Sequence, residues 1–386
     1  MSLWNRHGYT LLVCAVGCGT GFDVPVDARR PAEAGAPDVQ VDVAMTSDAG
    51  ANVVDAPFEA SCAPESETIF SCTATATTVL AEANYPGVDQ IMLDESYVYF
   101  NAVGLWRVPK NGGTPTIVVA QTNQGWPVLS AFALGDTYVS WLDYQQGTAT
   151  TPFYTFVESV PKQSCITGTV ATLTNDWLFG VLQVPSSDDV YVFSDGDGPD
   201  QNFYRVDTMG VATALTSTPY LSGDLGRSPS GVIYTLTDNV IYQLSGTTWV
   251  PFFSSSSLQA ETAGPLRFDA TNVYFQLCDL YTDAHWLVSV PQTGGATTTI
   301  AAANGSLGFS DYTLDGAGHL YATEREPNDV VRMNTDGSEH VILATGGTSG
   351  NPVEQAIGIA VDDTCVYWGS ADGEDDARNH VYATPK

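Results

Sequence analysis

Carboxylates in two short runs are the residues that point most clearly to chemistry. The runs are DGDGPD and DGEDD, and their acidic members are Asp195, Asp197, Asp200, Asp372, Glu374, Asp375 and Asp376. A hard cation such as calcium takes about six to eight oxygen ligands, and glycines let a loop curl around it. Calcium is therefore the one cofactor that the residues suggest. The first run lacks the bidentate Glu that ends an EF-hand loop, so a solvated acidic loop is the competing interpretation.

Aromatic residues near the same loops offer a second kind of binding surface. Five of them are expected on the face that carries the acidic runs: Tyr85, Trp126, Trp177, Tyr220 and Phe309. Rings beside carboxylates suit sugars or cationic peptides, so we predict a protein or glycan ligand at this face. The competing interpretation is that these rings cover the hydrophobic core.

Catalytic chemistry has little support in the sequence. His285 and His380 are the histidines expected near the acidic loops, and neither has a paired nucleophile. The chain contains no GxSxG, HExxH or phosphate-binding loop. A non-catalytic protein is therefore the first prediction, and a metal-assisted lyase or hydrolase that uses these two histidines is the alternative.

A repeat of 40 to 51 residues positions these loops. Its clearest unit, residues 91–120, reads as four short strands separated by turn residues. A buried residue of the second strand recurs at Val98, Val139, Val190, Ile233, Val273, Leu320 and Val366. Four strands in every unit, with no helical segment between units, predict an all-β fold, a β-propeller.

The two ends of the chain complete one unit together. The last unit stops at HVYATPK, before its outer strand, and a matching segment, TATATTVLA, occurs at residues 73–81. We therefore predict seven blades, with one blade closed by strands from both termini, and six or eight blades as alternatives. Closure removes the exposed sheet edges that would otherwise aggregate.

The repeats resemble those of two propeller families. The segment LYATEREPNDVVRMNTDGSEHVIL is similar to the YWTD repeat of receptor propellers and, more loosely, to NHL repeats, in its Tyr, its Arg before the Asp336-Gly337 turn and its apolar final strand. The resemblance covers the chain from about residue 73 to its end. No unit has the full tetrapeptide, and these families usually have six blades. The resemblance implies a non-catalytic interaction platform, with some enzymes among related propellers.

The loops sort to two faces of the predicted ring by connectivity alone. Short turns after each first strand, such as Asp94-Glu95-Ser96 and Asp362-Asp363-Thr364, lie on one face, where Asp side chains are expected to close Asx turns. The long acidic loops and the aromatic residues lie on the other face. Loops without a counterpart in the minimal repeat are where a rigid scaffold places binding groups.

The N-terminus is predicted to direct export. Residues 1–17 have a basic start, a short apolar run and small residues before Cys18, which is the pattern of a signal peptide. The tetrad Ala15-Val16-Gly17-Cys18 resembles the lipobox of bacterial lipoproteins, which implies that Cys18 carries lipid and becomes the mature N-terminus. In such lipoproteins the absence of Asp after the cysteine implies the outer membrane, facing the periplasm or the cell surface. An ordinary secreted protein is the alternative.

A linker separates this anchor from the propeller. Residues 18–60 are rich in Ala, Asp, Val and Pro and cannot bury a core, so we predict a disordered acidic tether followed by the propeller at 61–386. Exported proteins meet oxidising conditions, so disulfides are allowed. Cys62 or Cys72 is predicted to pair with Cys365 at the closing blade, and Cys165 and Cys278, three blades apart, are predicted to be unpaired.

The charge balance limits the partners. The chain has 13 Lys and Arg against 44 Asp and Glu, a net charge of -31, and only three lysines: Lys110, Lys162 and Lys386. Nucleic-acid binding depends on clustered basic residues, so nucleic acid is excluded. Together the residues predict a monomeric, membrane-anchored lipoprotein whose propeller binds a protein, a glycan or a cation.

Overall fold

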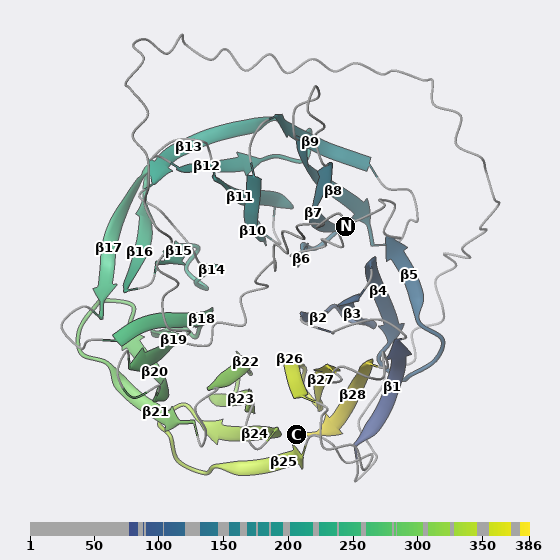
Figure 1. Ribbon diagram of the computed structural model, residues 1–386, viewed down its shortest axis with the longest axis vertical. Coiled ribbons are helices and arrows are strands. Elements are labelled where there is room, and N and C mark those ends of the chain that lie inside the picture. The colour runs from purple at the N-terminus through teal and green to yellow at the C-terminus, as the bar shows by residue number, and fades with distance from the viewer. Residues whose placement is uncertain are drawn as a thin grey trace, which may run out of the picture.

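The computed structural model describes most of the chain after residue 76. The described residues are 77–83, 88, 90–102, 104–119, 132–145, 154–162, 168–174, 177–184, 187–195, 201–218, 224–237, 239–255, 260–279, 282, 284–303, 308–324, 328–345, 355–371 and 379–386. Seven antiparallel four-stranded sheets stand around a central axis (Figure 1). The prediction of an all-β, seven-bladed propeller is confirmed. In the described part of the chain, no helix is long and apolar enough to cross a membrane.

Six blades take their four strands from one continuous stretch of chain, with the first strand innermost. Blades 1 to 3 comprise β2 (Ile91–Leu93), β3 (Tyr97–Ala102), β4 (Gly104–Pro109) and β5 (Thr116–Val119); β6 (Phe132–Leu134), β7 (Tyr138–Gln145), β8 (Tyr154–Pro161) and β9 (Gly168–Thr174); and β10 (Trp177–Val184), β11 (Asp189–Asp195), β12 (Gln201–Val206) and β13 (Ala212–Thr218). Blades 4 to 6 comprise β14 (Leu225–Arg227), β15 (Ile233–Leu236), β16 (Val240–Ser245) and β17 (Thr248–Ser254); β18 (Ala260–Phe268), β19 (Asn272–Asp279), β20 (His285–Pro291) and β21 (Thr298–Ala302); and β22 (Phe309–Leu314), β23 (His319–Glu324), β24 (Asp329–Asn334) and β25 (Val341–Thr345).

Blade 7 joins the two ends of the described chain. Its strands are β26 (Gln355–Val361), β27 (Cys365–Ala371), β28 (Asn379–Pro385) and, on the outside, β1 (Thr78–Ala83). β1 pairs antiparallel with β28 from Thr78↔Ala383 to Ala83↔Asn379. The predicted closure by strands from both ends is confirmed, and the closing strand begins a few residues later than the sequence pattern indicates.

The core lies between blades and not within any one of them. The seven repeat residues named above all fall in the second strand of their blade, and none is more than 7% exposed. A typical inter-blade cluster joins Tyr234 and Leu236 of blade 4 to Val273, Phe275 and Val288 of blade 5. Alternate residues of each strand face the two neighbouring blades, so both faces of every sheet are buried.

Both cysteines of the described residues form disulfides. Cys278 and Cys365 are each disulfide-bonded, and each partner lies outside the described residues. The prediction that Cys278 is unpaired is wrong. Pairing of Cys365 with Cys62 or Cys72 stays a prediction.

An aspartate in the first turn recurs in four blades. In each case Oδ1 accepts backbone N–H groups of the turn, as predicted for Asx turns, at Asp94, Asp269, Asp315 and Asp362. Oδ2 accepts a hydrogen bond of 2.6–3.1 Å from a tyrosine of the second strand, respectively Tyr99, Tyr274, Tyr321 and Tyr367. Each carboxylate therefore ties its turn to its own sheet.

Every lysine of the chain reaches one of these aspartates from the next blade in the ring. The pairs are Lys110–Asp362 at 3.0 Å, Lys162–Asp94 at 4.0 Å and Lys386–Asp315 at 2.9 Å. The lysine side chains are only 11–19% exposed. We call this Asp–Tyr–Lys arrangement the inter-blade clasp. It joins blade 7 to blade 1, blade 1 to blade 2 and blade 6 to blade 7.

The clasps of blades 6 and 7 stabilise the charged forms of Asp315 and Asp362. Burial opposes ionisation of Asp362, but the N–H groups of Thr364 and Cys365 and the ammonium of Lys110 outweigh it and lower the pKa of Asp362. Burial likewise opposes ionisation of Asp315, and hydrogen bonds from Lys386 and from backbone N–H groups hold its pKa well below the ordinary value. Removing a lysine would leave a mostly buried carboxylate without its counter-charge.

Lys110→Met should therefore destabilise the ring. We expect a loss of about 1–3 kcal/mol in the free energy of unfolding, between the values typical of exposed and of buried pairs. Urea unfolding of Lys110→Met, Asp362→Asn and the double variant measures the coupling between the two residues. A double variant that loses the full sum of the two single effects would show that the pair contributes nothing.

Candidate functional site

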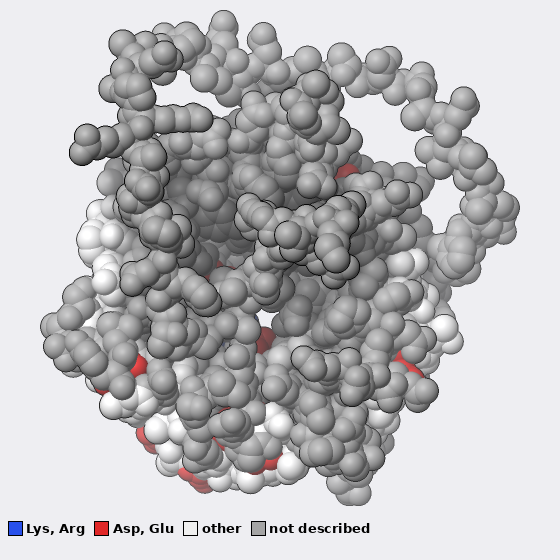
Figure 2. Space-filling model, viewed as in Figure 1, with Lys and Arg blue, Asp and Glu red and all other residues white. Residues whose placement is uncertain are grey.

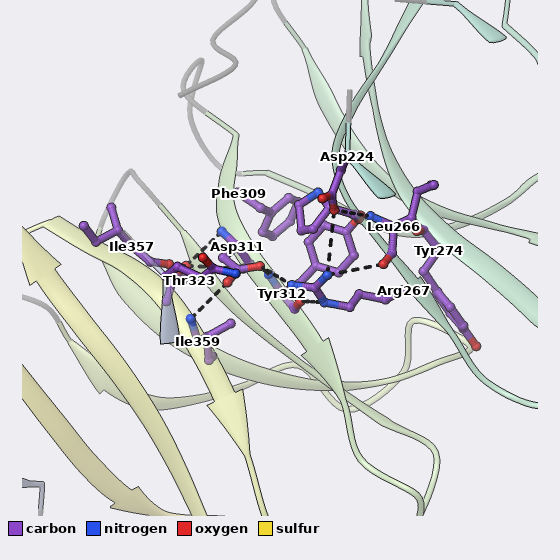
Figure 3. Close-up of polar contacts among 12 residues, drawn as sticks. Asp224, Leu266, Arg267, Tyr274, Phe309, Asp311, Tyr312, Thr323, Ile357 and Ile359 are labelled. Atoms are coloured by element: carbon purple, nitrogen blue, oxygen red, sulfur yellow. Dashed lines mark hydrogen bonds and ion pairs between the residues drawn. The ribbon is translucent and has the colours of Figure 1, made fainter. Parts of the chain in front are cut away.

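Three charged side chains from three blades meet at the inner wall of the ring. Asp224 immediately precedes β14, Arg267 lies in β18 and Asp311 lies in β22, which are the innermost strands of blades 4, 5 and 6 (Figure 3). We call these residues the channel triad. The view down the ring in Figure 2 shows acidic side chains beside a central opening, and no Lys or Arg is visible among the coloured atoms of this face.

An irregularity in β18 sets the position of Arg267. The pairing of β18 with β19 shifts register between Ala263 and Arg267. Gly264 within this bulge has φ 74°, and a Cβ atom there would lie 2.6 Å from the Nε2 atom of Gln276. Only glycine suits such a position, because other residues rarely adopt a positive φ and would clash. The bulge thus depends on Gly264.

The triad is connected to four blades by hydrogen bonds. Arg267 Nη2 lies 3.1 Å from Asp311 Oδ1, Arg267 Nη1 lies 4.0 Å from Asp224 Oδ2, and Arg267 Nε donates to the backbone oxygen of Tyr312 at 2.9 Å. Asp311 Oδ2 accepts the N–H of Ile359 in blade 7 at 3.1 Å (Figure 3). Relative movement of these blades would break charged contacts, so the triad is held rigidly.

With both aspartates ionised, the triad has a net charge of -1, because Arg267 supplies one positive charge against two negative ones. Burial raises the pKa of Asp311, although Arg267 beside it acts in the opposite direction and Asp224 adds a smaller repulsion. Burial by the surrounding walls also raises the pKa of Asp224, against the effect of Arg267. The Asp224 side chain is still 41% exposed, whereas Asp311 is 15% exposed. Asp224 is thus the member of the triad that a ligand can reach.

Tyr312 supports the triad from the core side. Its hydroxyl donates to the backbone oxygen of Pro265, within the bulge of β18, and lies 3.4 Å from the backbone oxygen of Tyr274. Burial raises the pKa of Tyr312 well above its ordinary value, so the hydroxyl stays protonated and serves as a donor. The arrangement as a whole can bind a cation or a hydrogen-bond donor at Asp224.

The structure does not bring the two predicted histidines together. His285 begins β20 in blade 5, is 2% exposed, and its Nε2 atom lies 3.8 Å from the Sγ atom of Cys278. His380 lies in β28 of blade 7, where its ring is 5.5 Å from that of Tyr382. A buried His285 cannot exchange protons with a ligand in the channel or at the loops.

Phe309 is the one predicted aromatic ligand contact whose side chain is described. It is 4% exposed and belongs to a core cluster with Leu287 and Tyr312. Gln276 of blade 5 holds its backbone, donating to the Phe309 oxygen at 3.0 Å and accepting from its N–H at 3.3 Å. The ring packs in the core, which agrees with the competing interpretation given above for the aromatic residues.

Trp177 and Asp195 are described in backbone only. Trp177 begins β10 and Asp195 ends β11, and the two residues are opposite each other in the register of blade 3. The sequence prediction placed an aromatic contact and a carboxylate ligand at these positions. The backbone brings them together at one end of the paired strands β10 and β11. The remaining predicted contacts lie outside the described residues: Tyr85, Trp126, Tyr220, Asp197, Asp200, Asp372, Glu374, Asp375 and Asp376. Within the described ranges, no three His, Cys, Asp or Glu side chains come together as metal ligands.

The sequence prediction missed the triad, although a signal for it exists. Asp224 and Arg267 are 43 residues apart, and Arg267 and Asp311 are 44 residues apart, close to one repeat. Charged residues separated by one repeat occupy similar positions in neighbouring blades, so their side chains meet between blades. A search for opposite charges at the repeat distance would have found all three.

The triad and the clasp should shift the pH dependence of stability in opposite directions. Because folding raises the pKa of Asp224, wild type should gain unfolding free energy relative to Asp224→Asn as the pH falls from about 7 to about 4. Because folding lowers the pKa of Asp362, wild type should lose its advantage over Asp362→Asn as the pH falls below about 4. Urea unfolding across this range measures both, and parallel pH profiles for the two variants would contradict the assignment.

Comparison with known proteins identifies the fold. No family model matches the chain, and no curated protein matches its sequence. The extracellular domain of the putative one component system BT4673 from B. thetaiotaomicron superposes with a TM-score of 0.55 at 13% identity, over 79% of this chain and 39% of that chain. The RRP9 WD40 repeats superpose with a TM-score of 0.55 at 11% identity, over 82% of this chain and 99% of theirs. The present chain thus spans well under half of the first protein, and what both likenesses establish is a β-propeller fold.

Proposed function

We propose that this protein is an exported outer-membrane lipoprotein whose propeller is a non-catalytic binding module. The observation that carries the binding role is the channel triad, which holds a partly exposed carboxylate at the centre of a ring of blades. A rigid scaffold lowers the entropic cost of binding because its contact groups are already in place. Trp177 and Asp195, opposite each other in the register of blade 3, support the proposal of a second contact surface for a protein, a glycan or a calcium ion at the acidic and aromatic loops.

The N-terminal sequence supports the anchor. Cys18 follows three small or apolar residues at the end of a short apolar run, and an acidic linker then separates it from the first described strand. A linker of this kind lets the ring stand away from the membrane, facing the periplasm or the cell surface. The net charge of -31 makes direct contact between the ring and anionic headgroups unfavourable, so attachment through lipid is the arrangement that fits.

Metal-assisted catalysis by His285 and His380 is the alternative function. The burial of His285 and its separation from His380 by two blades favour the binding module over this enzyme. General acid–base catalysis needs a group within hydrogen-bond reach of the substrate.

Cys18→Ala should abolish membrane attachment. We expect the wild type to incorporate labelled palmitate and to partition into the detergent phase, and the variant to do neither, because the thiol carries the lipid. Cys14→Ala is the matched control and should behave as wild type. Detergent-phase partition of Cys18→Ala would contradict the lipid anchor.

Binding and catalysis separate in one array experiment. The full chain with Cys18→Ala is applied to peptide and glycan arrays, and retained ligands are analysed by mass spectrometry. We expect that the array ligands that bind the protein keep their mass. The His285→Gln and His380→Gln variants of the same protein should bind these ligands equally well, because neither histidine contacts the ligand. Conversion of a ligand by the parent protein that is lost in either histidine variant would establish the enzyme instead.

A further inference from the structure

We propose that the channel triad binds a primary ammonium group at Asp224, presented by a lysine side chain or by a free polyamine. This inference rests on the binding role proposed above and adds the chemical class of the ligand and the residue that contacts it. It concerns the described inner wall of blades 4 to 6 and does not depend on the acidic loops.

Asp224 is the least satisfied member of the triad. Its nearest guanidinium nitrogen, Arg267 Nη1, is 4.0 Å away, which is beyond hydrogen-bond distance, whereas Arg267 Nη2 lies 3.1 Å from Asp311. Within the described residues, Asp224 Oδ2 accepts the N–H of Leu266 at 3.2 Å, and the carboxylate also accepts the N–H of Leu225. With 41% of its side chain exposed, Asp224 has both room and acceptor capacity for a further donor.

Arg267 cannot turn toward Asp224 without losing other contacts. Its Nε atom donates to the Tyr312 oxygen at 2.9 Å, its Nη1 atom to the Leu266 oxygen at 3.2 Å, and its Nη2 atom to Asp311. Figure 3 shows the guanidinium between the two aspartates, with these bonds directed to both sides. The planar fork is thereby fixed toward Asp311, and the uncompensated negative charge of the triad lies on the side of Asp224.

The other described cations are committed elsewhere. The three lysines form the inter-blade clasps, Arg205 pairs with Asp189 at 2.8 Å, and Arg107 donates to the Lys162 oxygen and covers the Tyr97 ring. The charge of Arg227 acts on Tyr191 of blade 3, and that of Arg332 acts on Tyr321 of its own blade. Arg267 is the cation that acts on Asp224 and on Asp311, which also repel one another. Within the described residues, the negative charge of the triad is therefore left for a ligand to neutralise.

A primary ammonium suits this site better than a metal ion. The triad lacks one positive charge, which one ammonium supplies, and its three N–H groups can each be shared with an acceptor. A divalent cation would need about six to eight oxygen ligands and would be repelled by the neighbouring guanidinium. An ammonium at the end of a flexible carbon chain can also enter the opening at the centre of the ring that Figure 2 shows.

Calorimetry on the full-length protein in detergent tests the proposal with two probes. The probes are spermidine and an acetylated Gly-Lys-Gly peptide amide, which distinguish a free polyamine from a peptide side chain. We expect saturable binding of at least one probe and about a ten-fold loss of affinity in Asp224→Asn, the effect of one lost charge-assisted hydrogen bond. Asp224→Glu keeps the charge and should retain most of the affinity.

Asp336→Asn is the matched control. Asp336 lies in an exposed turn of blade 6, away from the channel, and its substitution removes the same charge from the protein. Equal weakening by Asp224→Asn and Asp336→Asn, or no binding of either probe by a wild type that melts cooperatively, would overturn the proposal. If Asp224→Asn does not fold, Arg267→Lys becomes the deciding variant, because it keeps the positive charge but not the planar fork of the guanidinium. The expected result is then that spermidine no longer raises the melting temperature. The broader binding role is judged separately by the array experiment.

Discussion

The ring depends on a carboxylate that is shared between two blades. In the inter-blade clasp an aspartate holds its own turn and tyrosine, and a lysine from the next blade neutralises it. The contact joins elements that hydrophobic packing alone would only place side by side, because charged hydrogen bonds fix distance and direction. With so few cations against 44 acids, the chain assigns all of its lysines to this single task. What remains on the outside is acidic, which sets the kind of partner the protein can accept.

Closure and the channel follow from the same geometry. The pairing of β1 with β28 completes blade 7, and two clasps flank that blade, so the junction that joins the chain ends is braced on both sides. In blade 5, Asp269 and Tyr274 recur without a lysine, because the three lysines of the chain pair with the aspartates of other blades. The channel triad then connects blades 4 to 7 at the inner wall. The side chains of the channel triad are thus held both by the clasps between neighbouring blades and by the contacts of the triad itself.

The fold could be predicted from the sequence, and most of the site could not. Buried residues such as Val98 and Val366 recur at the repeat distance because each blade must bury the same strand, so the blade count and the closure are visible in the chain itself. Contacts between blades depend on how the repeats face one another, and the pairing of Arg267 with Asp311 is invisible until neighbouring repeats are aligned. Phe309 shows the reverse problem, because an aromatic residue at a loop end satisfies the pattern of a contact residue and of a core residue equally well.

Hydrogen exchange of the closing blade tests the central claim most directly. If the ring is closed by β1 and braced by the clasps, the amides of residues 78–83 that donate to β28 should exchange as slowly as the β28 amides paired with them, because both are released only by opening of the whole blade. Mass spectrometry of peptides from the two segments of the native protein provides the comparison. Equal and slow exchange is the predicted result. Fast exchange of residues 78–83 beside a protected β28 would show that the N-terminal strand does not hold the ring, and would contradict the account.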